Sequence, residues 1–347
     1  MSSARPLLEV EELRVEFPTD DGVLHAVDGI SYEVAQGGTL GIVGESGSGK
    51  TVSSLTTMGL TRAQGARISG RILFEGRDLL ECSEHEMRAI RGNDIAMIFQ
   101  DPLSSLHPFF RVGAQLAEAV RTHRSVSKAQ ANARAVELLE LVGIPDPARS
   151  VHEYPHEFSG GMRQRAMIAM ALANDPKLLI ADEPTTALDV TVQAQIIALL
   201  ERMQAELEMA IVIITHDLGV VAEIADDIAV MYAGRIVERA SAKALFSEPQ
   251  HPYAWGLLRS IPTLSGPREA ELVPIPGTPP SLINRPSGCH FHPRCAWAQP
   301  DHTRIDPALE EVPGEPGHSV ACLLTAEERR RGWLELEAGQ TPQGGSQ

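Results

Sequence analysis

The chain has few cysteines and no long apolar run, and each absence excludes a class of protein. Four cysteines among 347 residues are too few for a disulfide scaffold. The longest uninterrupted apolar run, Ala166 to Ala173, is far shorter than the roughly 18–20 residues that cross a bilayer. The opening residues MSSARPLLEVEEL lack the apolar segment of a secretory signal. We therefore expect a soluble protein in a reducing cytosol, where clustered cysteines indicate a metal more often than a disulfide.

The sequence is also poor in positive charge. Its 30 Lys and Arg residues are outnumbered by 46 Asp and Glu residues, which gives a formal charge of −16 at pH 7. Such a surface repels phosphate backbones, although a local basic patch can still exist on it. We expect no nucleic acid among the partners.

Short β-rich runs alternate with longer helical runs up to about residue 245. At 347 residues the chain is long enough for one large domain and a smaller one. Apolar runs bounded by turn signals predict buried strands at 39–44, 94–99, 178–182 and 210–215. Apolar residues at helical spacing predict helices at 128–143 and 191–208. This alternation predicts an α/β fold with a mainly parallel sheet.

Proline is concentrated towards the C-terminus. Of the 24 prolines, 15 lie between Pro249 and Pro342, a density that excludes long helices and central strands. We place a domain boundary near residue 247, after a first domain at 1–247. Residues 248–325 are expected to form an irregular, proline-rich module that contains most of the cysteines, and 326–347 a flexible tail that begins with a short helix.

The stretch GESGSGKT matches the phosphate-binding pattern G-x-x-x-x-G-K-[ST]. It follows the expected strand TLGIV and enters a helical run, which is the setting of a P-loop rather than of a chance glycine-rich turn. Backbone N–H groups would converge on the β-phosphate, Lys50 would add charge at the β- and γ-phosphates, and Thr51 would offer a hydroxyl to Mg²⁺. The predicted nucleotide-binding residues are Gly44, Glu45, Ser46, Gly47, Ser48, Gly49, Lys50 and Thr51.

Polar residues end three further strands. In LLIADEP, Asp182 is suited to hold Mg²⁺ through water, and Glu183 to orient or deprotonate the attacking water. The alternative is that Asp182 and Glu183 are an ordinary solvated acidic pair. The presence of a P-loop makes this alternative the weaker one. In IVIITHD, His216 would contact the γ-phosphate, although an ordinary strand-end histidine is the more common case. Gln100, in MIFQDP, is open to the same two interpretations.

The stretch FSGGMRQR precedes the acidic strand by one helix length. Ser159, Gly160 and Gly161 open a helix whose free N–H groups suit an anion, and an ordinary Ser-Gly helix cap is the alternative. This stretch resembles the signature of ABC-transporter ATPases.

The motifs together resemble an ABC ATPase. The resemblance assigns Walker A to Lys50 and Thr51, the Q-loop to Gln100, the signature to Ser159, Gly160, Gly161 and Met162, Walker B to Asp182 and Glu183, the D-loop to Asp189, the switch histidine to His216 and the adenine-stacking aromatic to Phe17. Strand-face packing is the alternative for Phe17. The resemblance implies catalytic roles for Glu183, His216, Gln100 and Lys50, and contacts to Mg²⁺ from Thr51, Gln100 and Asp182.

The family's architecture and mechanism are implied in the same way. The expected fold is a RecA-like, mainly parallel core with an antiparallel β subdomain and a helical subdomain inserted at about 100–162, which contacts the membrane partner. Two ATPase subunits, related or identical, face each other head to tail, so that ATP at one P-loop is covered by the other subunit's signature. Closure drives a motion that hydrolysis resets.

A narrower resemblance extends from about Leu8 to Leu323. FQDPLSSLHP, YPHEFSGGMRQR, PQHPYAWGLL, PIPGTPPSL and GCHFHPRC resemble, in this order, ATP-binding subunits of oligopeptide and dipeptide importers. His107 stands where that family usually has asparagine. The implied partners are two transmembrane permeases and an extracytoplasmic solute-binding protein, and the implied place is the cytoplasmic face of the cell membrane. The cargo stays open between oligopeptides, dipeptides, glutathione, nickel and other solutes.

Two rival functions are weaker. A non-transport ABC ATPase that acts on ribosomes or DNA usually fuses two units or carries a long coiled coil, whereas this chain has one uninterrupted unit. A nucleotide-dependent scaffold with weak turnover conflicts with the intact Glu183 and His216.

Three cysteines gather near the C-terminus. The family resemblance implies a ligand set of Cys289, Cys295 and Cys322, with His302 where a fourth cysteine is typical. Thiolates and imidazole suit a [4Fe–4S] cluster or zinc, and the absence of any metal is the third possibility. Cys82 lies far away in sequence and is expected to be inert.

Overall fold

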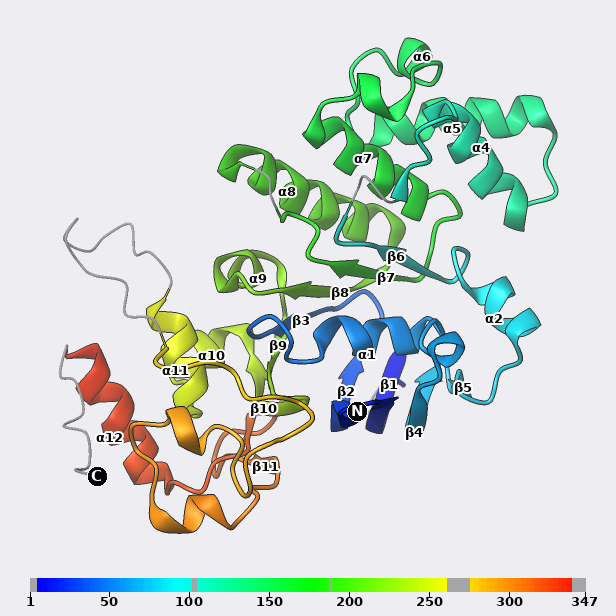
Figure 1. Ribbon diagram of the computed structural model, residues 1–347. Helices are drawn as coiled ribbons and strands as arrows, with labels where there is room; N and C mark the ends of the chain where they lie inside the picture. Colours follow the sequence, from blue (N-terminus) through cyan, green and yellow to red (C-terminus); the bar gives the residue numbers. More distant parts are fainter. Residues whose placement is uncertain (1–4, 102–104, 187–188, 261–274, 339–347) are drawn as a thin grey trace.

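The structure, a computed structural model, describes residues 5–101, 105–186, 189–260 and 275–338. It contains an eight-stranded sheet in the order β11-β12-β10-β9-β3-β8-β7-β6 and a four-stranded sheet in the order β2-β1-β4-β5 (Figure 1). The larger sheet comprises β3 (Thr39–Val43), β6 (Ile95–Ile98), β7 (Leu178–Asp182), β8 (Ala210–Thr215), β9 (Asp227–Tyr232), β10 (Arg235–Ser241), β11 (Glu310–Glu311) and β12 (Ser319–Val320). The smaller comprises β1 (Leu8–Thr19), β2 (Gly22–Val34), β4 (Arg67–Phe74) and β5 (Arg77–Asp78).

The centre of the larger sheet is parallel. β9, β3, β8, β7 and β6 run in one direction, whereas β10 and β12 join as antiparallel strands. All residues of β3, β6, β7 and β8 are buried, as expected for strands that are covered on both faces. The predicted α/β fold is confirmed, and the four strands expected from the sequence correspond to β3, β6, β7 and β8.

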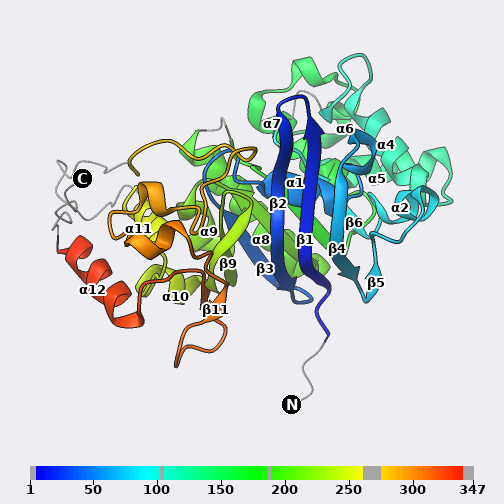
Figure 2. The same ribbon diagram turned by 60° about the horizontal axis from the view of Figure 1, so that its bottom comes forward.

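The two faces of the parallel strands carry different layers. On one face α1 (Lys50–Thr57) lies between these strands and the smaller sheet, and Ile180 of β7 belongs to the buried cluster there. On the other face the next residue back along β7, Leu179, packs in a second cluster with α7 (Gly160–Ala171) and α8 (Val190–Leu207). Figure 1 shows α1 on one side of β7 and β8 and the two longer helices on the other. Figure 2 shows β2, β1 and β4 side by side over α1.

A group of helices is inserted between β6 and β7. It consists of α4 (Val112–His123), α5 (Lys128–Leu141) and α6 (Pro147–Ser150), which gather at one end of the molecule (Figure 1). α5 begins at a capping box, in which Ser127 and Gln130 each accept a hydrogen bond from the other's backbone N–H. Shorter helices elsewhere in the first 247 residues are α2 (Glu84–Ile90), η1 (Arg62–Gln64), η2 (Pro155–Glu157), α9 (Leu218–Ile224) and α10 (Ala242–Ser247).

The proline-rich part extends the larger sheet. After α11 (Pro252–Arg259), residues 275–325 form the turns η3 (His292–Arg294) and η4 (Pro300–Thr303), the edge strand β11 and its neighbour β12. β12 pairs with β10 through Val320 and Glu238. The carboxylate of Glu238 is fully buried. It accepts hydrogen bonds from the backbone N–H groups of Gln250 and His251, both at 2.7 Å, and lies 2.9 Å from Nε2 of His318.

The last described element is α12 (Ala326–Glu337), at the start of the stretch for which the sequence predicts a short helix and a flexible tail. Its Gly332 lies against the ring of Trp255 in α11. That ring also contacts the rings of Trp297 and Trp333. Residues 339–347 lie outside the described residues.

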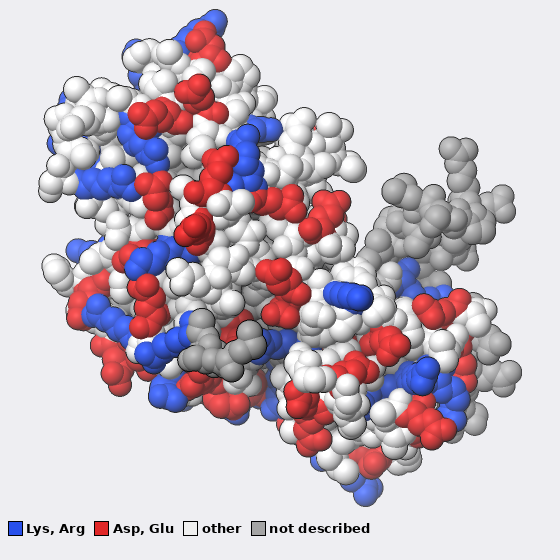
Figure 3. Space-filling model, turned by 180° about the vertical axis from the view of Figure 1, so that it is seen from behind, with Lys and Arg blue, Asp and Glu red and all other residues white. Residues whose placement is uncertain are grey.

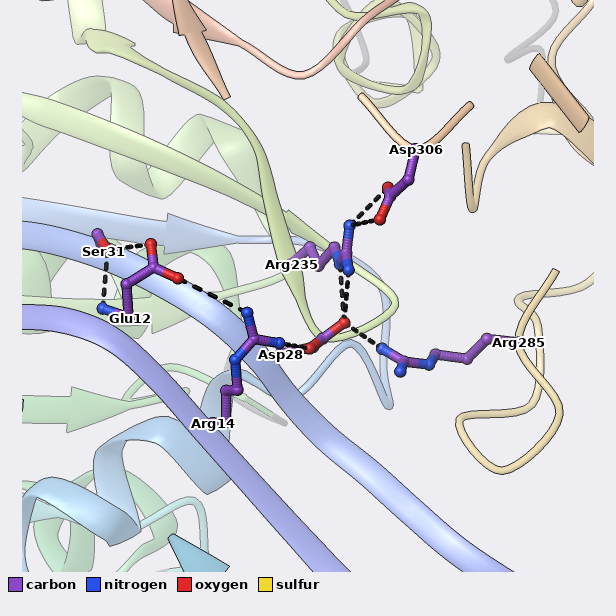
Figure 4. A network of polar contacts seen from close by, with 7 residues as sticks. All are labelled: Glu12, Arg14, Asp28, Ser31, Arg235, Arg285 and Asp306. Carbon is purple, nitrogen blue, oxygen red and sulfur yellow. Dashed lines mark hydrogen bonds and ion pairs between the residues drawn. The ribbon is translucent and has the colours of Figure 1, made fainter. Parts of the chain in front are cut away.

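A polar network fastens the C-terminal residues to β2 (Figure 4). Asp28 accepts hydrogen bonds from Arg14, from Nε of Arg235 at 2.9 Å and from Nη1 of Arg285 at 2.5 Å. Arg235 also donates to Asp306 at 2.5 Å. Burial by itself would raise the pKa of Asp28, but the hydrogen bonds from Arg235 and Arg285 outweigh it and lower this pKa to about 2. The carboxylate therefore stays charged and links three separate parts of the chain.

Acidic and basic side chains are interspersed on the face drawn in Figure 3. Among the described residues, no helix is both long enough and apolar enough to span a bilayer.

Candidate functional site

The loop between β3 and α1 needs glycine at particular positions. Gly44, Gly47 and Gly49 have φ angles of 154°, 79° and 102°, in the region that favours glycine. A Cβ atom at Gly44 would lie 2.1 Å from the carbonyl oxygen of Met231, and one at Gly49 would lie 2.2 Å from that of Ala26. The loop is therefore pressed against β9 and β2, which fixes its path.

Lys50 lies at the centre of this loop. Its side chain is buried, and its ammonium donates to the carbonyl oxygens of Gly44 at 2.6 Å and Glu45 at 3.0 Å, with Ser48 Oγ at 3.5 Å. Burial lowers the pKa of Lys50, while the nearby carboxylates of Glu183 and Asp182 act in the opposite direction. The loop thus wraps a cation at the N-terminus of α1, which is an arrangement suited to a polyphosphate.

Two predicted Mg²⁺ contacts touch each other. Asp182 ends β7 and is buried, and its Oδ1 accepts a hydrogen bond of 3.1 Å from Thr51 Oγ1. Burial raises the pKa of Asp182, and the adjacent Glu183 adds to this effect, whereas Thr51 and Lys50 oppose it. A hydroxyl and a carboxylate side by side are oxygen donors of the kind that Mg²⁺ prefers.

Two further predicted residues converge on the carboxylate of Glu183, which was itself predicted. Gln100 Nε2 donates to it at 2.8 Å, and His216 Nδ1 lies 3.2 Å from Oε1. They meet because β6, β7 and β8 are parallel, so that their carboxyl ends share one edge of the sheet. Glu183 has φ 48°, an uncommon backbone conformation for a residue other than glycine.

Thr186 also holds Glu183, and the sequence did not single it out. Its hydroxyl donates to the same carboxylate at 2.8 Å. Burial would raise the pKa of Glu183, but the hydrogen bonds from Thr186 and His216 and the charge of Lys50 lower it overall. The only available signal was its position three residues after Glu183 in the same turn.

The signature residues lie on the other face of the sheet from α1. Ser159 is the N-cap of α7, and its Oγ accepts a hydrogen bond of 3.3 Å from the backbone N–H of Met162. Ser159 and Gly160 are exposed. A Cβ atom at Gly161 would lie 3.2 Å from Val192 of α8. The structure thus does not bring these residues to the P-loop of the same molecule.

Two other predicted contacts keep ordinary structural partners. Phe17 is half-buried, pairs with Leu24 across β1 and β2, and packs against the cluster that contains α1. Asp189 is the N-cap of α8 and accepts a 3.0 Å hydrogen bond from the N–H of Val192. The preceding residues of the expected D-loop, 187–188, lie outside the described residues. Adenine stacking by Phe17 and nucleotide contact by Asp189 stay predictions.

The expected C-terminal metal site is not supported. Within the described ranges, Cys289, Cys295 and Cys322 are free thiols, and no three or more His, Cys, Asp or Glu residues form a group that could hold a metal ion. Burial raises the pKa of Cys295 to about 12 and that of Cys322 to about 11. His302 uses Nδ1 to accept a 3.2 Å hydrogen bond from Gln299. The described residues therefore give no support to an iron–sulfur cluster or to zinc at this place.

Two family models match separate parts of the chain. Residues 27–186 match the model described as ABC transporter, and residues 237–301 match that of the oligopeptide/dipeptide transporter C-terminal region. The second match covers α11, η3 and the first two cysteines of the expected set.

Similar proteins and structures agree with these matches. The oligopeptide transport ATP-binding protein OppD of Bacillus subtilis is 53% identical over 88% of this chain and 86% of its own length. The dipeptide transport ATP-binding protein DppD of the same organism is 50% identical over 92% of this chain and 94% of its own length.

Solved structures show the same fold. The ATP-binding cassette MJ0796, in a dimeric post-hydrolysis structure bound to ADP and Pi, has a TM-score of 0.61 and 23% identity over 68% of this chain and 98% of that chain. For CbiO1 from Clostridium perfringens, part of the ABC transporter complex cbiONQ, the TM-score is 0.60 and the identity 30%, over 71% of this chain and 92% of that chain. The chain therefore belongs to the ABC transporter family, among the ATP-binding proteins of oligopeptide and dipeptide transport.

Proposed function

We propose that this chain is the ATP-hydrolysing, energy-coupling subunit of an ABC importer for peptides. The observation that supports this most is the convergence of Lys50, Asp182 and Glu183 with Gln100 and His216 at one edge of the parallel sheet. That edge is where open α/β sheets bind ligands. Peptides are the proposed cargo because the relatives are oligopeptide and dipeptide transport proteins.

Each residue of the convergent group has a chemical task in this proposal. The P-loop N–H groups and Lys50 bind the phosphates, and Mg²⁺ held by Thr51 and Asp182 would offset their negative charge. Glu183 orients the attacking water and accepts its proton, and its lowered pKa means that the carboxylate is ionised before it does so. His216 and Gln100 position Glu183 and respond to the γ-phosphate. Gln100 would offer its amide oxygen to Mg²⁺.

A second ATPase subunit, identical or related, completes the site. The signature at Ser159 lies across the sheet from the P-loop of its own chain, so we propose that it covers the nucleotide of a partner subunit. The dimeric ATP-binding cassette of the same fold is consistent with such pairing. Two permeases would receive the motion at the inserted helices, and a solute-binding protein would deliver peptide. The chain would then lie peripherally on the cytoplasmic face of the membrane.

Replacement of Glu183 tests the hydrolytic role. Glu183→Gln should lower the kcat for ATP by about 10²–10⁴-fold, the usual contribution of a general base, while binding of ATP persists. Glu201→Gln, on an exposed part of α8, is the matched control and should keep its activity. The measurement is phosphate release by the full chain together with its permeases in vesicles, with and without peptide. Normal turnover in Glu183→Gln would reject the assignment.

A further inference from the structure

Glu45, the second residue of the P-loop, has all three of its polar groups engaged. Its backbone N–H donates to Tyr253 Oη at 2.8 Å, and its carboxylate accepts from Arg294 Nη1 at 2.6 Å and Nη2 at 3.0 Å. Its carbonyl oxygen accepts from Lys50 at 3.0 Å. Two of these partners lie in the C-terminal residues, and the third is the cation of the loop. Glu45 thus connects the C-terminal residues directly with Lys50 of the P-loop.

The two C-terminal partners are themselves held firmly. Tyr253 is fully buried, and its ring contacts those of Tyr232 at 4.6 Å and Phe291 at 5.5 Å. Arg294 is also buried, and its Nε donates to the carbonyl oxygen of Pro276 at 2.8 Å. Both lie within residues 237–301, which match the oligopeptide/dipeptide transporter C-terminal region. The C-terminal region that this chain shares with oligopeptide and dipeptide transporters therefore contacts the P-loop directly.

The charge of Glu45 makes this contact relevant to nucleotide binding. A carboxylate in a loop that receives a polyphosphate repels the ligand. The bidentate pair with Arg294 neutralises this carboxylate and turns it towards the C-terminal residues. The hydrogen bond to Glu45 is the main cause that raises the pKa of Arg294, so this side chain remains a cation.

We propose that Arg294 is a positioning residue for the P-loop: it neutralises Glu45 and, with Tyr253, fixes the backbone that holds Lys50. The C-terminal region thereby sets the affinity for Mg-ATP. This inference rests on the proposed nucleotide site at Gly44–Thr51 and adds a role for residues outside it. Arg294 acts through Glu45 and makes no contact with the phosphates in this account.

Other contacts keep the C-terminal region in place when Arg294 is changed. Arg285 binds Asp28 and Arg235 binds Asp306 (Figure 4). In addition, β12 pairs with β10. The backbone N–H of His25 also donates to the carbonyl oxygen of Leu282 at 3.1 Å. Loss of the Arg294 side chain should therefore release Glu45 without detaching the region.

The test is a double substitution in the full-length chain. Arg294→Ala should raise the Kd for Mg²⁺-AMP-PNP about tenfold, because a charge-assisted bond is lost and a free carboxylate remains in the loop. Adding Glu45→Gln should restore the Kd to within about threefold of the wild type, since the repelling charge is then gone. The KM for ATP should follow the Kd, and kcat should change much less. Titration calorimetry at fixed ionic strength measures the Kd.

Controls separate this role from a structural one. Arg304→Ala removes an exposed cation from the same region and should leave the Kd unchanged. Arg294→Lys keeps the positive charge and should raise the Kd less than Arg294→Ala does. It also provides the test if Arg294→Ala does not fold. An unchanged Kd in both Arg294 variants, or a double variant no better than the single one, overturns the proposal. Normal binding by Lys50→Ala would instead reject the nucleotide site itself.

Discussion

The glycines of the P-loop illustrate how a single residue is constrained in two different ways. Gly47 and Gly49 both have positive φ angles. A Cβ atom at Gly47 would meet no described atom within 4 Å, whereas one at Gly49 would lie 2.2 Å from the Ala26 carbonyl oxygen. Conformation alone therefore requires glycine at the first position, and conformation and space together require it at the second.

These two positions give a matched pair of alanine substitutions. Gly47→Ala should lower the free energy of unfolding by about 1–2 kcal/mol, the cost of a left-handed conformation for a residue with a side chain. Gly49→Ala should lower it by about 3–5 kcal/mol, because the backbone of β2 or of the loop must also move. Urea denaturation at pH 7 measures both. Equal midpoints for the two variants would contradict the geometry.

At the residue scale, contiguous motifs were predictable and long-range partners were not. Gln100, Glu183 and His216 were each found at a strand end, and the parallel sheet brings them together. Arg294 and Glu45 are 249 positions apart. No sequence pattern around either residue predicts that they form a pair. The family resemblance implied a metal site at the C-terminal cysteines, but no such site is formed among the described side chains.

At the scale of elements, periodicity predicted the interior strands and helices. The buried runs at 178–182 and 210–215 are β7 and β8, and the helical run at 128–143 is α5 with its end at Leu141. The edge strand β11 and its neighbour β12 have two residues each, too few for any period to show. Their pairing depends on where the folded chain returns to β10. The sequence pattern does not predict that position.

The bond between β2 and the C-terminal residues has a defined dependence on pH. The pKa of Asp28 is about 2 in the folded chain, below the ordinary aspartate value of 3.8. Because the folded pKa is the lower one, this carboxylate stabilises the fold above about pH 4, and the contribution is lost as pH falls from about 4 towards 2. The shift corresponds to about 2 kcal/mol at neutral pH.

Asp28→Asn should therefore unfold more easily than the wild type at pH 7, by about 2 kcal/mol or more. The difference between the two proteins should be constant above about pH 5 and should shrink on acidification below about pH 4. Urea denaturation at a series of pH values gives both curves. A difference that grows as the pH falls would have the wrong sign for an ionised, paired carboxylate.

At the scale of the whole molecule, the separation of α1 and α7 on opposite faces of the sheet divides nucleotide binding from turnover. The P-loop of one chain can hold ATP by itself in the proposed mechanism. In the same proposed mechanism, hydrolysis requires the signature of a second subunit. Substitutions in the P-loop should thus impair nucleotide binding, whereas substitutions in the signature should impair ATP turnover.

Ser159→Arg tests this division. The Kd for Mg²⁺-AMP-PNP should stay within about twofold of the wild type, since Ser159 is exposed at the start of α7 and distant from its own P-loop. ATP turnover by the assembled transporter should fall at least about tenfold, because an arginine side chain obstructs closure over the partner's nucleotide. Lys50→Ala should instead lose binding. Loss of binding in both variants would contradict a shared site.

The burial of Glu238 has a consequence for where this protein can be cut or recombined. Its carboxylate lies in β10, but the groups that satisfy it belong to Gln250, His251 and His318. If the chain ended near residue 247, the charged carboxylate of Glu238 would stay in the interior without hydrogen-bond donors. This would strongly destabilise the fold. A C-terminal region taken from a relative should therefore be tolerated only if it returns two backbone N–H groups and a donor in the place of His318 to this carboxylate.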